Sequence, residues 1–181
     1  MSLADPREIA EFWRDVGPDK WFVANEALDR EIRTRFRTTH EVAAHGELAA
    51  WEESSEGALA LVILLDQFPR NMFRGAARAF ATDALARRVA ENALVRNFDP
   101  LVHEAMRLFF YLPFMHSEAL ADQDRSLQLF GALGNVEQLK YAVIHRDIIS
   151  RFGRFPHRND VLGRATTPAE RIFLEEGGFA G

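Results

Sequence analysis

Apolar residues recur at helical spacing along most of the chain. Asp5 followed by Pro6 is typical of a helix start, with an N-capping side chain and proline in the first turn. The apolar positions that follow lie three or four residues apart: Ile9, Phe12, Trp13 and Val16. Similar runs and capping signals predict further helices over residues 25–44, 79–97, 99–112, 117–133, 135–152 and 167–176.

One segment is apolar on almost every side. In the run from Ala58 to Phe68, which follows Gly57, the only polar residues are Asp66 and Gln67. Such a run indicates a helix buried among other helices, with a buried parallel strand as the alternative. The helix is favoured because alanine and leucine outnumber β-branched residues and no second strand-like run exists for pairing. Pro69 is expected to end the element, with residues 68–75 as a loop.

These elements predict an all-α fold with seven to nine helices and short connections. We expect one domain over residues 1–181, built from stacked antiparallel helix pairs. The tetratricopeptide signature is absent at any period of 34 residues, so a repeat architecture of that kind would be degenerate.

Composition excludes several classes of protein. The 181 residues include no cysteine, which excludes a disulfide framework, a thiolate zinc site and a cysteine nucleophile. The longest apolar run is far shorter than the ~20 residues of a membrane span. The N-terminus carries acids and a proline where a signal peptide needs a basic start, so we expect a cytoplasmic protein that does not insert into membranes. The net charge of −5 does not favour nucleic-acid binding.

Three motifs occur in a fixed order along the chain. They are LLDQFPRN from Leu64, YLPFMHSE from Tyr111 and RFGRFPHRN from Arg151. With these motifs, the sequence resembles a bacterial family known as the domain-of-unknown-function family numbered 924, over nearly its whole length. The resemblance implies a tetratricopeptide-like helical fold. It implies no activity, cofactor or site residue.

The first motif places a carboxylate in apolar surroundings. A buried Asp66 must be paired, hydrogen-bonded or protonated, and Arg70 and Asn71 are its nearest partners in sequence. Asp66 is therefore either part of a structural network or a general base or ligand contact.

Histidines mark the second motif and the helix that precedes the third. His145 lies beside the apolar face of its helix, which suits either a core histidine or a general base. His116 and Glu118 follow the helix break at Pro113, at a spacing that matches no local metal motif. A metal site would need Asp66, His116, Glu118, His145 and His157 to converge from several elements, so we predict no metal and no cofactor.

The segment from Arg151 to Arg164 concentrates positive charge in an ordered loop, which we call the arginine-rich loop. Phe152 and Phe155 are expected to anchor this loop, and glycine and proline fix its turns. Two interpretations stay open. One is a pocket for a phosphate or carboxylate, and the other is a set of arginines that join helices by pairing with Asp66, Glu118, Asp122 or Asp124. The candidate ligand-binding residues here are Arg151, Arg154, His157, Arg158, Asn159 and Arg164.

Two functional hypotheses follow from these residues. The first is a site for a small anionic molecule, with Asp66, His116 and His145 as candidate catalytic residues. Its ligand contacts would come from Arg70, Asn71, Glu118 and the arginine-rich loop. The second is an adaptor that binds a peptide or partner protein along a concave helical face, which depends on the fold resemblance alone.

Overall fold

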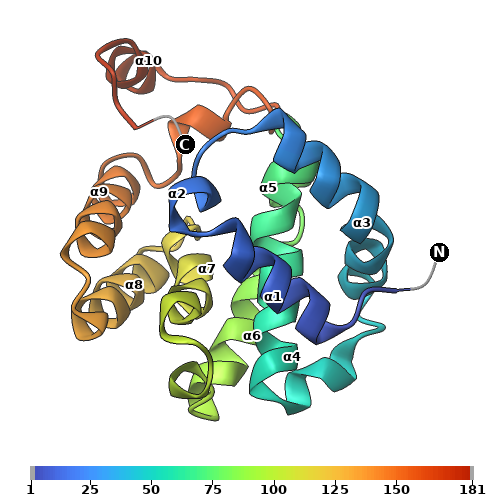
Figure 1. The fold of residues 1–181 in the computed structure, drawn as a ribbon. Helices are drawn as coiled ribbons and strands as arrows, with labels where there is room; N and C mark the ends of the chain where they lie inside the picture. The colour runs from blue at the N-terminus through green and yellow to red at the C-terminus, as the bar shows by residue number, and fades with distance from the viewer. Residues whose placement is uncertain (1–2, 180–181) are drawn as a thin grey trace. The chain divides into compact units, whose positions relative to one another are not determined.

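Helices account for every regular element of residues 3–179, the part of the chain that the computed structural model describes. This confirms the all-α prediction (Figure 1). None of the helices in this part of the chain is both long enough and apolar enough to cross a bilayer.

Contacts divide the chain into two compact units. The first contains residues up to Arg74 and Arg78–Pro113, and the second contains Gly75–Ala77 and the residues from Phe114 onward. The prediction of one domain stays a prediction. The elements up to Met115 are α1 (Pro6–Val16), α2 (Pro18–Trp21), α3 (Glu26–Ala44), η1 (Ala49–Glu53), α4 (Ser55–Val62), η2 (Ile63–Gln67), α5 (Phe68–Met72), η3 (Ala77–Phe80), α6 (Asp83–Val95), η4 (Asp99–Leu101), η5 (Glu104–Phe110) and α7 (Leu112–Met115).

The apolar run forms the centre of the first unit. Ser54 caps α4 by accepting a hydrogen bond from the Gly57 amide, and every residue from Gly57 to Pro69 is buried. α4 packs against α1 and α6, so its apolar surface is covered from more than one side (Figure 1). The buried helix was therefore the correct interpretation of this run, and the strand was not.

Pro69 does not end this helix, which corrects the predicted loop at residues 68–75. The chain passes through a π-helical turn, η2, and continues as α5 to Met72. Proline lacks the N–H that would bond to the carbonyl four residues earlier, here that of Leu65. The Thr82 hydroxyl donates to this oxygen at 2.6 Å, and His40 Nδ1 donates to the Leu64 oxygen at 2.8 Å. Two side chains thus supply the missing donors, and the wider turn accommodates the proline ring.

Two other predicted helices differ from the structure. The helix expected from residue 79 begins at Asp83, after the short 3-10 turn η3. The segment before Pro113 is 3-10 rather than α-helical over Glu104–Phe110. Its apolar side chains are nevertheless buried, as the sequence indicated, and Phe109 packs against Trp13 and Trp21.

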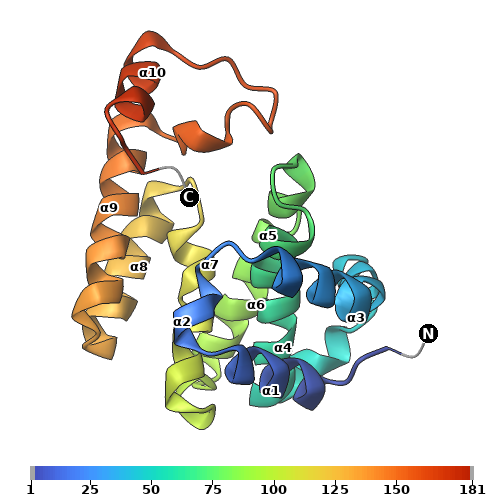
Figure 2. The same cartoon turned by 45° about the horizontal axis from the view of Figure 1, so that its top comes forward.

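A helical hairpin forms the frame of the second unit. α8 (Leu120–Leu133) and α9 (Val136–Phe152) lie side by side (Figures 1 and 2). Gly134 ends α8 in the left-handed conformation with φ 75°, and Asn135 then caps α9, so the connection is short. After α9 the chain forms the arginine-rich loop with its 3-10 turn η6 (Pro156–Arg158), and then α10 (Pro168–Glu175). Thr167 and Glu170 form the capping box that the sequence predicted.

Candidate functional site

In the first unit, Arg70 joins two carboxylates at the edge of the core. Its Nη1 atom lies 3.4 Å from the carboxylate of the fully buried Asp66. The two Nη atoms donate to Asp83 at 2.9 and 3.0 Å, and Gln67 Nε2 donates to Asp66. Burial lowers the pKa of Arg70, but Asp66 and Asp83 outweigh it, so this pKa lies above its usual range. Asp66 is therefore the buried carboxyl partner of a charged Arg70.

Asn71 belongs to a neighbouring contact in the same unit. Its amide donates to Asp29 Oδ1 at 2.8 Å, and Arg74 donates to both oxygens of Asp29 at 2.9 and 3.0 Å. These bonds attach the end of α5 to α3, a pairing across more than 40 residues of sequence.

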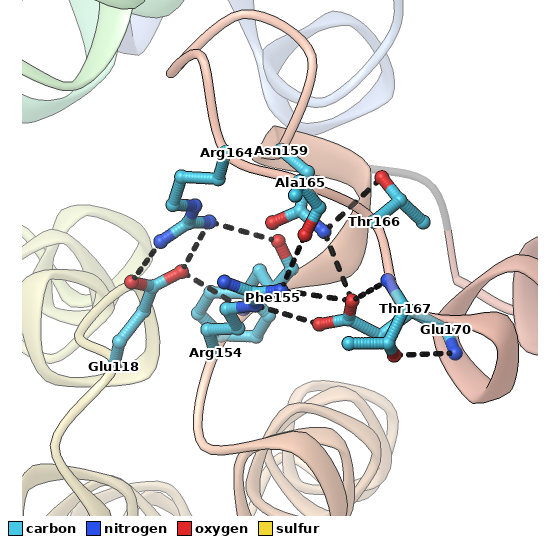
Figure 3. Close-up of polar contacts among 9 residues, drawn as sticks. All are labelled: Glu118, Arg154, Phe155, Asn159, Arg164, Ala165, Thr166, Thr167 and Glu170. Atoms are coloured by element: carbon cyan, nitrogen blue, oxygen red, sulfur yellow. Dashed lines mark hydrogen bonds and ion pairs between the residues drawn. The ribbon is translucent and has the colours of Figure 1, made fainter.

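In the second unit, Arg154 and Arg164 each bind a carboxylate through two hydrogen bonds, and these two bidentate pairs fix the loop that follows α9 (Figure 3). Arg164 donates from both Nη atoms to Glu118 at 2.7 and 3.0 Å, and Glu118 also accepts the Phe155 amide at 2.8 Å. Arg154 donates to the two oxygens of Glu170 at 2.6 and 2.9 Å. Bidentate pairs of this kind hold geometry as well as charge, so the loop is stiffly positioned.

The remaining loop residues take different positions. Asn159 is fully buried, and its amide donates to Glu170 Oε2 at 3.3 Å. Arg158 is also buried, stacks 4.4 Å from the centre of the Phe155 ring and donates to the His116 carbonyl at 3.1 Å. Arg151 is exposed and lies over the rings of Phe152 and Phe173. Arg151 is therefore separate from the two bidentate pairs, which Arg154 and Arg164 form.

Three histidines of the second unit gather around two phenylalanine rings. The ring centre of His145 lies 6.5 Å from that of His116, 5.4 Å from Phe155 and 4.5 Å from Phe179. His157 lies 5.7 Å from each of the two phenylalanines. We call His116, His145 and His157 the histidine cluster.

His145 and His157 are neutral at pH 7. Burial lowers the pKa of His145 to about 3, with His116 and Arg158 adding to the effect. Burial and Arg158 lower the pKa of His157 to about 4. His145 Nδ1 lies 2.8 Å from the Tyr141 carbonyl, which only accepts, so Nδ1 carries the proton and Nε2 does not.

The lowered pKa of His145 predicts a loss of stability in mild acid. Between about pH 6.5 and 3 the unfolded chain binds a proton that the folded chain does not, so stability falls as the pH falls through this window. From pH 7 to pH 5 this residue should cost about 2 kcal/mol. Urea unfolding at both pH values tests this, because His145→Gln should remove that part of the loss, whereas exposed His45→Gln should not. Equal losses in wild type and His145→Gln would contradict the assignment.

The predicted site residues therefore fall into two groups. Asp66, Arg70 and Asn71 belong to the first unit, whereas the second contains the histidine cluster, Glu118 and the arginine-rich loop. Sequence reasoning missed Asp29 and Asp83 as partners of the first group, and Glu170 as the partner of Arg154. Glu170 was visible only as part of a helix cap, and nothing in its spacing indicated a second bond to the loop.

No metal-binding arrangement accompanies these residues in the described part of the chain. Within residues 3–179, no group of three or more His, Asp or Glu side chains is placed to hold a metal ion. A hollow of about 40 Å³ lies in the first unit between Leu61, Leu65, Arg88 and Glu52. It has room for about one or two water molecules, and none of the predicted site residues lines it.

The fold and sequence match proteins that have no assigned activity. A protein of unknown function from Agrobacterium tumefaciens has a similar structure, with a TM-score of 0.91 and 52% sequence identity. The similarity covers 95% of this chain and 97% of the other. Residues 9–178 match a family described as a bacterial protein of unknown function, DUF924. The chain belongs to this family. No curated protein matches it.

Membership in DUF924 confirms the resemblance that the three motifs indicated. It adds no substrate, cofactor or partner, so the function has to be argued from the residues themselves.

Proposed function

We propose that the second unit binds a small oxyanion between the arginine-rich loop and the histidine cluster. One observation carries the proposal, namely that Arg164 Nε, His157 Nδ1 and Asn159 Oδ1 are buried without a hydrogen-bond partner in the described part of the chain. Each such atom costs roughly 1–3 kcal/mol unless a ligand or an ordered water bonds to it. These three atoms come from one short loop. Both Nη atoms of Arg164 already bond to Glu118, which leaves its Nε as the nitrogen without a partner.

The charge of this region supports an anion. Arg154, Arg158 and Arg164 set against Glu118 and Glu170 leave a formal excess of one positive charge among these residues, with His145 and His157 neutral at pH 7. An oxyanion would accept hydrogen bonds from the Arg164 Nε–H and from the His157 Nδ1–H of the neutral ring. Asn159 Oδ1 accepts only, which favours an oxyanion that also carries a hydroxyl, such as hydrogen phosphate or a hydroxycarboxylate.

Binding is better supported than acid–base catalysis. A general base works best when its pKa lies near the working pH, and His145, with a pKa of about 3, is far below neutrality. Asp66, another candidate base, is fully buried and ion-paired in the first unit. We also keep as part of this proposal the cytoplasmic location that the sequence predicts.

A thermal-shift titration with inorganic phosphate and with lactate tests the proposal. Ligand at a hundred times its Kd adds about 2.7 kcal/mol, which corresponds to roughly 5–10 °C for a chain of this length. His157→Gln should lose most of the shift, and exposed His45→Gln should keep it. Because phosphate stabilises proteins non-specifically at high concentration, the difference between these two variants is the deciding measurement.

A flat titration, or equal shifts in wild type and His157→Gln, would overturn the proposal. The alternative would then be the adaptor that binds a peptide or partner protein through tetratricopeptide-like helix pairs.

A further inference from the structure

The histidine cluster has a cover that comes from the segment after α10. Phe179 packs on His145 and His157, and it also lies against the small apolar core of Ile148, Ile149 and Phe155. This segment leads back from α10 past α9 (Figure 2). Phe179 therefore lies over two histidines whose pKa values are lowered by burial.

Two glycines set the path of this segment. Gly177 adopts φ +81°, a conformation that other residues rarely take, and so turns the chain at the end of α10. The Gly178 amide donates to the Phe173 carbonyl at 2.9 Å. A Cβ atom on Gly178 would lie only 2.5 Å from Phe173, so this close approach also requires glycine. The glycine pair therefore sets the turn by which the chain leaves α10 and reaches Phe179.

The cover is light compared with the loop beneath it. Phe179 is only partly buried, and within residues 3–179 its contacts are ring and apolar contacts. The loop, in contrast, is held by two bidentate ion pairs. Opening at Phe179 therefore requires no charge to be separated, whereas moving the loop does.

We propose that Phe179 is a hinged lid that controls access to the histidine cluster, and hence entry of the oxyanion. The proposal builds on the proposed function, since the ligand is the one argued above. Gly177 and Gly178 form the hinge, and His145 Nε2 and the His157 ring are the groups that the lid shields from solvent.

Chemical modification of the histidines tests the lid without any ligand. Diethylpyrocarbonate acylates an unprotonated imidazole nitrogen, and peptide mass spectrometry reports the rate at His145 and His157 separately. Phe179→Ala should raise both rates by about tenfold, because an aromatic contact of this kind shifts an open–closed equilibrium by roughly that factor. Ile172→Ala removes an exposed apolar side chain from α10 and should leave both rates unchanged.

Phe179→Leu keeps an apolar cover and should react at a rate close to that of the wild type. It also guards against unfolding in Phe179→Ala, which circular dichroism and an unchanged modification rate of the buried His40 would exclude. Equal rates at His145 and His157 in wild type and Phe179→Ala would overturn the lid.

The same variants separate the lid from the proposed function. Stopped-flow mixing with phosphate should give faster association and dissociation in Phe179→Ala than in wild type. If modification accelerates and phosphate binds to neither protein, the lid is supported and the oxyanion proposal fails. If phosphate binds at equal rates to both proteins, the lid does not control entry and is overturned.

Discussion

Replacing Arg70 by alanine is expected to lower the free energy of unfolding by about 3–5 kcal/mol. Arg70 is the cation that two carboxylates share, and one of them, Asp66, has no exposed surface. Removing Arg70 takes this cation away from the buried Asp66 carboxylate, in surroundings where charge is poorly solvated. The variant also loses the hydrogen bond from Arg70 to the Asp66 carbonyl, which lies inside the π-helical turn.

Urea unfolding of three variants measures this effect. Arg30→Ala is the matched control, because Arg30 and its partner Glu26 are both well exposed on α3 and the pair should contribute less than about 1 kcal/mol. The double variant Asp66→Asn, Arg70→Ala should recover part of the loss, since a carboxamide carries no charge to leave uncompensated. A loss in Arg70→Ala no larger than that in Arg30→Ala would show that the buried pair is not stabilising.

The fold could be predicted from the sequence where the determinants are local. The caps at Asp5, Asn135 and Thr167 each depend on residues within three positions, and all three are present in the structure. The burial of the run from Ala58 to Phe68 likewise follows from its own composition. Short-range chemistry of this kind is readable from a single sequence.

The course of the chain at Pro69 could not be predicted in that way. Proline normally ends a helix, and here two side chains distant in sequence, His40 and Thr82, replace the donor that it lacks. The pairings of the arginine-rich loop pose the same difficulty. Glu118 was among the expected partners, but its pairing with Arg164 depends on how the loop folds back toward the start of α8. The pairing of Glu170 with Arg154 depends on how α10 packs against the loop.

Replacing Glu170 by glutamine is expected to lower the free energy of unfolding by about 2–4 kcal/mol. Both oxygens of this buried carboxylate bind Arg154, and Oε2 also accepts the Thr167 amide at 2.7 Å. The Arg154 hydrogen bond outweighs burial and lowers the pKa of Glu170 to about 2, so the group is ionised at neutral pH. Glutamine can keep the bond from Thr167, but its amide NH₂ would face the guanidinium, where two donors cannot bond.

The loss should be concentrated in the segment that Glu170 holds. Arg154, Asn159 and Thr167 all bond to this carboxylate, so hydrogen exchange should accelerate at the amides of residues 153–167 while the core of α4 keeps its protection. Exposed Glu175→Gln on the same helix removes a similar charge without a buried partner and should change stability by less than about 0.5 kcal/mol. Unchanged exchange in residues 153–167 of Glu170→Gln would mean that Glu118 and Arg164 alone fix the loop, and with it the frame on which the oxyanion site depends.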